Sequence, residues 1–222
     1  MREYINPGTI KAARLSFRYR AWLAAIVVAA LGAFSPAAQA QPFTIAVLGD
    51  SLAAGYGLPS ALAFPARLEA ALKSAGRDVK VINAGVSGDT TAGGKARLDW
   101  TLADKPDLII LELGGNDALR GLPPEQTEAN LDAMLQRIKQ AKVKVLLAGM
   151  LAPPNWGREY GDAFKAIYPR LAAKHGVKLY PFFLDGVAAD AALNQPDGIH
   201  PNQRGVDVIV ARIQALVLET MQ

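Results

Sequence analysis

The sequence predicts an α/β fold: a three-layer α/β/α sandwich around a five-stranded parallel sheet, flavodoxin-like in its strand order. Three observations lead to this prediction. Five short apolar runs rich in β-branched residues read as strands covered on both faces, because they lack the strict alternation of half-exposed strands. Segments with helical periodicity separate these runs, and small or polar residues follow the strand ends. Alternating strands and helices favour a parallel sheet with helices on both faces.

The expected elements follow one another in a regular order. The expected strands are FTIAVLG (43–49), VKVINAG (79–85), DLIILELG (107–114), VKVLLAG (143–149) and VKLYPFF (177–183). The expected helices cover 64–76, 91–104, 123–141, 160–176 and 201–221. In the third helix an apolar stripe lies near the helical period and comprises Ala129, Leu131, Met134, Leu135 and Ile138. Gly76 and Gly176 stand where helices are expected to end.

The first 40 residues form a separate segment. Arg14, Arg18 and Arg20 precede the apolar run AWLAAIVVAALGAF (21–34), and SPAAQA with Ala38 and Ala40 follows it. A basic, an apolar and a small-residue part in this order predict a signal peptide at 1–40, cleaved after Ala40. The alternative is a membrane anchor, but this run is short against the roughly 20 residues that span a bilayer. We therefore expect a periplasmic or secreted protein with no stable anchor after cleavage, and a single domain at 41–222.

The leader also accounts for the positive charge of the chain. Five of the 24 basic and one of the 20 acidic residues lie in 1–40, so the remainder carries 19 of each. A neutral mature chain gives no basic face for nucleic acid. The sequence has no cysteine, which excludes disulfides and thiolate metal sites. The spacing of its acids and histidines favours no metal site, so no metal is expected.

Small and polar residues follow the carboxyl ends of the first three expected strands. These are GDS (49–51), GVSGD (85–89) and GGND (114–117). In doubly wound sheets ligands bind at this edge. Glycine lets a backbone amide approach a ligand, and the Asn116 side-chain amide is a directional donor. Ser51 is then either a turn residue after a strand or a nucleophile facing a cleft, while Asp50 and Asp117 are expected to accept hydrogen bonds that shape the loops.

A nucleophilic serine needs a base, and the sequence has two histidines. His175 ends a helix before Gly176, where a solvated histidine is typical. His200 lies in the loop QPDGIHPN, three residues after Asp197, with Gly198 between them for a tight turn. A local turn can place the Asp197 carboxylate against the imidazole, as a catalytic triad requires. His200 is therefore the candidate base, the alternative being a solvated surface loop.

Taken together, four motifs in this order resemble the conserved blocks of the SGNH (GDSL) hydrolase superfamily. They are GDSL at 49–52, SGDTTAGG at 87–94, GGND at 114–117 and DGIHPN at 197–202. The segments LELGGNDALRG, AIYPRLA and PFF, with DGIHPN, further resemble the bacterial secreted thioesterase I, arylesterase and lysophospholipase-like branch. The resemblance covers essentially all of 44–220.

The resemblance implies the fold of that superfamily and an esterase or thioesterase that acts through an acyl-enzyme without a cofactor. It implies Ser51 as nucleophile, His200 as general base and Asp197 as the residue that orients it. The oxyanion would be held by the backbone amides of Ser51 and Gly88 and by the side chain of Asn116. The loop 149–161 departs most from a recognisable pattern, and we expect it to contribute to substrate binding through Met150, Leu151, Pro153 and Trp156.

Other interpretations remain open at this point. A carbohydrate acetylesterase shares the same motifs, and a non-catalytic binding protein of the cell envelope could share the fold. Ser87 in GVSGD lacks the last glycine of the nucleophile-elbow pattern, which makes it a poor second nucleophile. The expected partner is a small acyl ester or thioester, with no nucleic acid, and the expected oligomeric state is a monomer.

Overall fold

The computed structural model describes residues 41–222, so the expected signal peptide at 1–40 lies outside the described residues. The strands are β1 (Phe43–Gly49), β2 (Val79–Gly85), β3 (Leu108–Glu112), β4 (Lys144–Ala148) and β5 (Lys178–Tyr180). The longer helices are α3 (Phe64–Ser74), α4 (Thr91–Ala103), α6 (Pro124–Gln140), α7 (Arg158–His175) and α8 (Gln203–Met221). Two short α-helices, α2 (Ser51–Ala54) and α5 (Gly115–Leu119), and two 3-10 turns, η1 (Ser60–Leu62) and η2 (Pro154–Trp156), lie in the connections.

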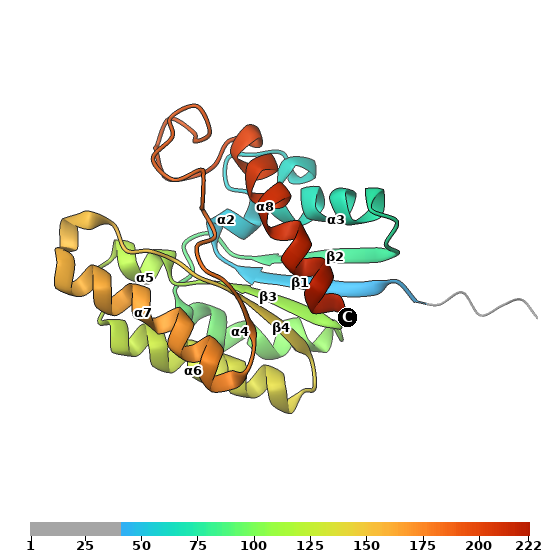
Figure 1. Cartoon of the computed structure of the whole chain (residues 1–222), viewed down its shortest axis with the longest axis horizontal. Helices are drawn as coiled ribbons and strands as arrows, with labels where there is room; N and C mark the ends of the chain where they lie inside the picture. The colour runs from blue at the N-terminus through green and yellow to red at the C-terminus, as the bar shows by residue number, and fades with distance from the viewer. Residues whose placement is uncertain (1–40) are drawn as a thin grey trace, which may run out of the picture. The chain divides into compact units, whose positions relative to one another are not determined.

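The sheet is parallel throughout and has the order β2-β1-β3-β4-β5. Helices α3 and α8 cover one face, and α4, α6 and α7 cover the other (Figure 1). The order is that of flavodoxin-like doubly wound sheets, whose topological switch lies between the first and third strands. The predicted fold class is therefore confirmed. Among residues 41–222, no helix is both long enough and apolar enough to cross a membrane.

The helices bury the apolar faces that their sequence periodicity indicates. In α6 the stripe residues Leu131, Met134, Leu135 and Ile138 are at most 1% exposed, whereas Ala129 lies outside the buried face. On the other side of the sheet, Phe64 of α3 packs edge-on against Phe183 with 5.0 Å between ring centroids. The buried apolar residues of the helices and of the strands form one hydrophobic cluster.

Two expectations about the strands were wrong in detail. The run 79–85 is apolar enough for a fully covered strand, yet only Val79 of β2 is buried, because β2 is an edge strand. The last run was expected to be a strand to 183, but β5 ends at Tyr180 before Pro181. Backbone hydrogen bonds from Gly149 N to Tyr180 O (2.7 Å) and from Phe183 N to Gly149 O (2.8 Å) continue beyond it, so the chain turns rather than detaches.

The register of the central strands aligns their carboxyl ends. Gly49, the last residue of β1, is paired with Gly85 on β2 and with Glu112 on β3. The three loops that follow these strands therefore start side by side at one edge of the sheet, as the switch-point prediction requires.

Candidate active site

Ser51 is the first residue of a helix that begins immediately after the central strand β1. Asp50 caps this helix, α2, because its Oδ1 accepts a hydrogen bond of 3.0 Å from Leu52 N. Gly49 is required just before it, since a Cβ there would lie 2.5 Å from Glu112 Oε2. The sharp strand-to-helix turn leaves the Ser51 side chain at the sheet edge.

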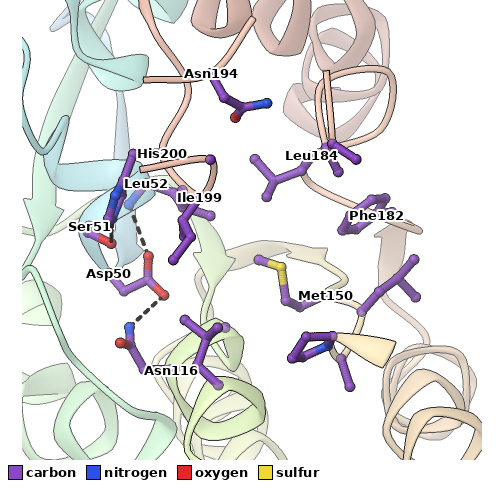
Figure 2. A pocket seen from close by; sticks show the side chains of 18 of the residues that line it. Asp50, Ser51, Leu52, Asn116, Met150, Phe182, Leu184, Asn194, Ile199 and His200 are labelled. Carbon is purple, nitrogen blue, oxygen red and sulfur yellow. Dashed lines mark hydrogen bonds between the residues drawn. The ribbon is translucent and has the colours of Figure 1, made fainter. Parts of the chain in front are cut away.

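Ser51, His200 and Asp197 form a continuous hydrogen-bonded chain. Ser51 Oγ lies 2.9 Å from His200 Nε2, and His200 Nδ1 lies 2.7 Å from Asp197 Oδ2. Figure 2 shows Ser51 and His200 facing each other at one end of a cavity. The serine and the histidine are 149 positions apart in the sequence, so this contact depends on the tertiary fold.

The loop 197–200 holds the imidazole through a local turn. Asp197 Oδ1 accepts hydrogen bonds from Ile199 N (2.9 Å) and His200 N (3.0 Å), with Gly198 at φ +71 between them. The amides of His200 and Ile199, and then the His200 side chain, lower the pKa of Asp197 to about 2. Asp197 is therefore a carboxylate at any physiological pH and fixes Nδ1–H of the imidazole.

Tyr56 covers one face of His200. The two ring centroids are 4.6 Å apart with a tilt of 37°. Gln195 fixes this arrangement, because its Nε2 donates to Tyr56 O (2.7 Å) and to Pro201 O (3.0 Å). The sequence analysis missed Tyr56, whose position next to the imidazole depends on two loops far apart in the chain.

Three groups at this edge of the sheet have an N–H that donates to no acceptor within residues 41–222. Within residues 41–222, the backbone N–H groups of Ser51 and Gly88 donate to no protein acceptor. Asn116 Nδ2 donates one hydrogen to Asp50 Oδ2 (3.1 Å) and keeps its second. Gly88 does not line the cavity; it lies on the turn after β2, next to the end of β1.

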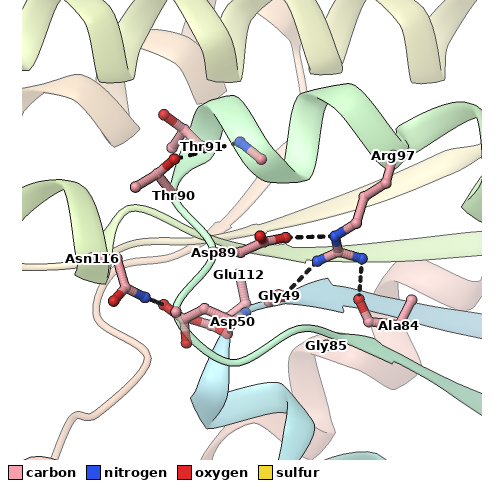
Figure 3. Close-up of polar contacts among 12 residues, drawn as sticks. Gly49, Asp50, Ala84, Gly85, Asp89, Thr90, Thr91, Arg97, Glu112 and Asn116 are labelled. Atoms are coloured by element: carbon pink, nitrogen blue, oxygen red, sulfur yellow. Dashed lines mark hydrogen bonds and ion pairs between the residues drawn. The ribbon is translucent and has the colours of Figure 1, made fainter.

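Arg97 of α4 fastens the ends of β1 and β2 to the turn that carries Gly88 (Figure 3). Its guanidinium donates to Gly49 O (2.7 Å), Ala84 O (2.5 Å) and the Asp89 carboxylate (2.6 Å). The side chain is 14% exposed and its three nitrogens all have acceptors. A single cation thus joins the residue before Asp50 to the loop after β2.

Asp117 fastens α5 to the start of α4. Its carboxylate accepts from Thr91 N (2.8 Å), Thr91 Oγ1 (2.5 Å) and Thr127 Oγ1 (3.3 Å). The residue is 1% exposed. The expected hydrogen bonding of Asp50 and Asp117 is present, and both serve to fix neighbouring loops rather than to face the cavity together.

Two buried carboxyl groups lie beneath the Ser51 turn. Burial raises the pKa of Asp50 to about 6. Burial, and secondarily the charge of Asp50, raises the pKa of Glu112 well above its usual value. Glu112 Oε2 accepts from Asp50 N (3.3 Å), while Oε1 is buried with no hydrogen-bond partner. The sequence analysis missed Glu112, although an acid surrounded by the apolar residues of 108–113 is a visible signal.

An apolar cavity of about 420 Å³ opens beside Ser51. The expected loop contributes Met150, Leu151 and Pro153 to its wall. Trp156 does not line it; its indole packs against Tyr160 (6.1 Å between centroids) and over Gly121. The rest of the wall was not expected from the sequence and includes Phe182, Leu184, Ala188, Ala189, Asn194 and Ile199.

His175 is not the solvated residue that its helix-end position predicted. Its side chain is 7% exposed, and Nε2 lies 2.6 Å from Asp132 Oδ1 of α6. Lys174 contacts the same carboxylate at 2.7 Å. This cluster joins α6 to α7 away from Ser51. Residues 41–222 contain no group of three or more His, Asp or Glu side chains placed to hold a metal ion.

Known proteins resemble this chain over most of its length. Residues 47–208 match the GDSL-like Lipase/Acylhydrolase family. The chain is 46% identical over 164 residues to Esterase TesA of Pseudomonas aeruginosa, covering 73% of this chain and 82% of that protein. It is 43% identical over 179 residues to Thioesterase 1/protease 1/lysophospholipase L1 of Escherichia coli K12, covering 78% and 85%. The crystal structure of AlinE4, an SGNH-hydrolase family esterase, matches with a TM-score of 0.70 and 46% identity over 83% of this chain and 100% of that chain.

Proposed function

The chain belongs to the GDSL-like lipase/acylhydrolase family, and from this premise we propose that it is a serine hydrolase that cleaves acyl esters and thioesters. The observation that carries the proposal is the hydrogen-bonded chain from Ser51 Oγ through His200 to Asp197, with distances of 2.9 and 2.7 Å. A hydroxyl, an imidazole and a carboxylate in this order activate serine for acyl transfer. The relatives named as esterase and as thioesterase and lysophospholipase support the same reaction class.

In the first half of the proposed reaction Ser51 Oγ attacks the acyl carbonyl carbon. His200 Nε2 takes the hydroxyl proton, and Asp197 stabilises the imidazolium that forms while remaining ionised itself. His200 then gives this proton to the leaving alcohol or thiol, and the acyl group remains on Ser51 as an ester. In the second half, water attacks this ester with His200 again acting as base, which releases the acid and restores Ser51.

The tetrahedral intermediate carries a negative oxygen that needs donors. We assign this role to the backbone amides of Ser51 and Gly88 and to the second hydrogen of Asn116 Nδ2, the donors with capacity to spare. A donor fixed before the reaction needs no reorganisation as charge develops, and losing one such donor costs about 10²–10³ in kcat.

The apolar cavity supports a fatty acyl group as the portion bound beside Ser51. Its walls of aliphatic and aromatic side chains offer little to hydrogen-bond a sugar. Each methylene buried there contributes about 0.8 kcal/mol. The cavity therefore favours acyl chains longer than acetyl, and a sharp rate maximum at acetyl would instead support a carbohydrate acetylesterase.

We propose that residues 1–40 direct export and are removed, which leaves a monomeric enzyme without an anchor in the periplasm or outside the cell. The order of basic, apolar and small-residue parts in the leader supports this. N-terminal sequencing of the exported protein is expected to start at Gln41, and gel filtration is expected to give the mass of one chain.

The test of the proposed reaction compares wild type with Ser51→Ala and His200→Ala. Both variants are expected to lose hydrolysis of p-nitrophenyl butyrate by several orders of magnitude, as removal of a triad member does elsewhere. A fluorophosphonate probe is expected to label wild type at Ser51 and to leave Ser51→Ala unlabelled. Equal rates in wild type and Ser51→Ala would reject the proposal.

A further inference from the structure

Helix α5 and Arg120, the residue that caps its C-terminal end, carry two side chains that point to different parts of the oxyanion site. Asn116 and Arg120 stand one helical turn apart, and Arg120 N donates to Asn116 O (3.1 Å). The Arg120 guanidinium reaches the turn after β2, where Nη2 donates to Gly88 O at 2.9 Å. One short element therefore contacts Gly88 and also carries Asn116, two of the three proposed donors.

The direction of the Gly88 N–H depends on the type of turn that contains it. Asp89 N donates to Val86 O (3.1 Å), which closes a four-residue turn with Gly88 in third position at φ +84. A positive φ there is characteristic of a type II turn. In the alternative type I turn the peptide between Ser87 and Gly88 is flipped, so the Gly88 N–H points to the opposite side. Only one of the two turns can present this amide to the substrate.

The base of this turn is held firmly, but its tip is not. Val86 N donates to Gly49 O (3.1 Å), and Asp89 is paired with Arg97. At the tip, Ser87 and Gly88 are exposed. A Cβ built on Gly88 would meet only Arg120 Nη2, at 3.9 Å, so no other side chain packs against the tip. The remaining constraint on the tip within residues 41–222 is the hydrogen bond from Arg120.

We propose, on the basis of the proposed function, that Arg120 is a positioning residue: by holding Gly88 O it ties the tip of this turn to the end of α5 and so keeps the Gly88 N–H in place relative to Asn116, the neighbouring proposed donor. Arg120 does not line the substrate cavity and makes no contact with the triad. Its guanidinium suits this task because its planar donors have fixed directions, whereas a lysine ammonium at the end of a flexible chain does not. Asp117, bonded to Thr91 at the start of α4, keeps α5 at the right distance for this contact.

The effect of losing Arg120 is expected in the transition state rather than in substrate binding. An oxyanion donor stabilises the ground-state carbonyl only slightly, whereas it stabilises the tetrahedral oxyanion strongly. Arg120→Ala should therefore lower kcat about 10- to 100-fold, less than the roughly 10²–10³ that complete loss of a donor costs, because the untethered tip still visits the productive position. KM should stay within about threefold of the wild-type value, because the interactions made equally with substrate and transition state are unchanged.

The experiment compares Arg120→Ala and Arg120→Lys with Arg158→Ala, using the mature chain. Arg158 is the matched control because its side chain is 93% exposed and, within residues 41–222, forms an ion pair with Asp162 alone. The measurements are kcat and KM for p-nitrophenyl butyrate, the inhibition constant of an alkylboronic acid that forms a tetrahedral adduct, and the thermal midpoint. We expect both Arg120 variants to lose kcat and boronate affinity by similar factors, with an unchanged midpoint, and guanidinium ion to restore part of the activity of Arg120→Ala.

A second readout reports on the amide itself. In wild type, boronate binding should shift the Gly88 amide proton resonance downfield, and in Arg120→Ala this shift should be reduced. Wild-type kcat in Arg120→Ala, a rise in KM alone, or an unchanged Gly88 shift would overturn the inference. A wild type as inactive as Ser51→Ala would instead overturn the proposed function, so the two failures are distinguishable.

Discussion

The side-chain amide of Asn116 donates a hydrogen bond of 3.1 Å to the carboxylate of Asp50, the residue that precedes Ser51. The same carboxylate caps helix α2 through Leu52 N at 3.0 Å. Asp50 therefore fixes both the turn that carries the proposed nucleophile and the rotation of a proposed oxyanion donor. The ionised form of Asp50 is unfavourable in the folded state, because the residue is 2% exposed and its burial raises the pKa to about 6.

Replacing Asp50 by asparagine should separate these two tasks. The new amide oxygen can still accept from Leu52 N, but its NH2 group faces the NH2 group of Asn116, and two donors cannot bond each other. We expect kcat to fall about 10- to 100-fold, less than the roughly 10²–10³ that complete loss of an oxyanion donor costs, because Asn116 is displaced rather than removed. The thermal midpoint at pH 8 should stay equal or rise, since a buried charge is removed. Asp162→Asn, on the exposed surface, is the control, and wild-type kcat in Asp50→Asn would contradict the assigned role of Asp50.

The buried carboxyl groups of Asp50 and Glu112 should make the folded state less stable as the pH rises. The pKa of each is raised in the folded state, Asp50 from 3.8 to about 6 and Glu112 well above 4.5. Between the unfolded and the folded pKa the native state holds more protons than the unfolded state, so its stability decreases with increasing pH. For Asp50 alone the decrease between about pH 4 and pH 6 is on the order of 3 kcal/mol.

Glu112→Gln tests this linkage in a single comparison. The variant should lose less unfolding free energy than wild type between pH 5 and pH 8, because it has no carboxyl to ionise at that site. Urea unfolding at both pH values provides the measurement, and the exposed Glu125→Gln provides the control. Equal pH slopes in wild type and Glu112→Gln would show that Glu112 does not destabilise the fold on ionisation.

The fold and the hydrogen-bonded arrangement of Ser51, His200 and Asp197 could be predicted because both leave strong local patterns. Buried strands show as apolar runs, and the residues that follow them must lie at the sheet edge once the sheet is parallel. The loop DGIH places Asp197 against His200 through a turn that the sequence itself specifies, and the observed hydrogen bond is 2.7 Å. Ser51 follows from the strand end in the same way.

The supporting residues could not be predicted, because their partners carry no sequence signal. Arg97 and Arg120 bond backbone carbonyls of Gly49, Ala84 and Gly88, and any residue type supplies a carbonyl. The cavity wall at 182–199 is irregular and has no periodicity to read. Trp156, in contrast, was expected to bind substrate and lies outside the cavity wall. Its indole packs against Tyr160 instead.

Gly88→Ala should reduce activity far more than stability. Gly88 has φ +84 with open space around its Cα, so an added methyl group meets backbone strain but no steric clash. Relief of the strain favours the type I turn, which removes the Gly88 N–H from the oxyanion. We expect kcat to fall on the order of 10²-fold.

Gly76→Ala is the matched control for this prediction. Gly76 has φ +77, a Cβ built on it would meet nothing within 4 Å, and it follows helix α3 away from the site. Both variants should lose about 1 kcal/mol of unfolding free energy from the same strain. Only Gly88→Ala should lose activity, and an equal loss in both would show that the Gly88 amide has no special role.

Ala188→Trp should shorten the acyl chain that the enzyme accepts. Ala188 lines the apolar cavity but is exposed, so a larger side chain can enter the cavity without overpacking the core. Displacing two or three methylene groups of the substrate loses about 2 kcal/mol of apolar burial. We expect kcat/KM for p-nitrophenyl dodecanoate to fall at least about tenfold, by that same energy, while kcat/KM for p-nitrophenyl acetate stays unchanged. Ala191→Trp, three residues along the chain and outside the cavity wall, should leave the whole chain-length profile as in wild type. A parallel loss for acetate and dodecanoate would place the acyl chain elsewhere.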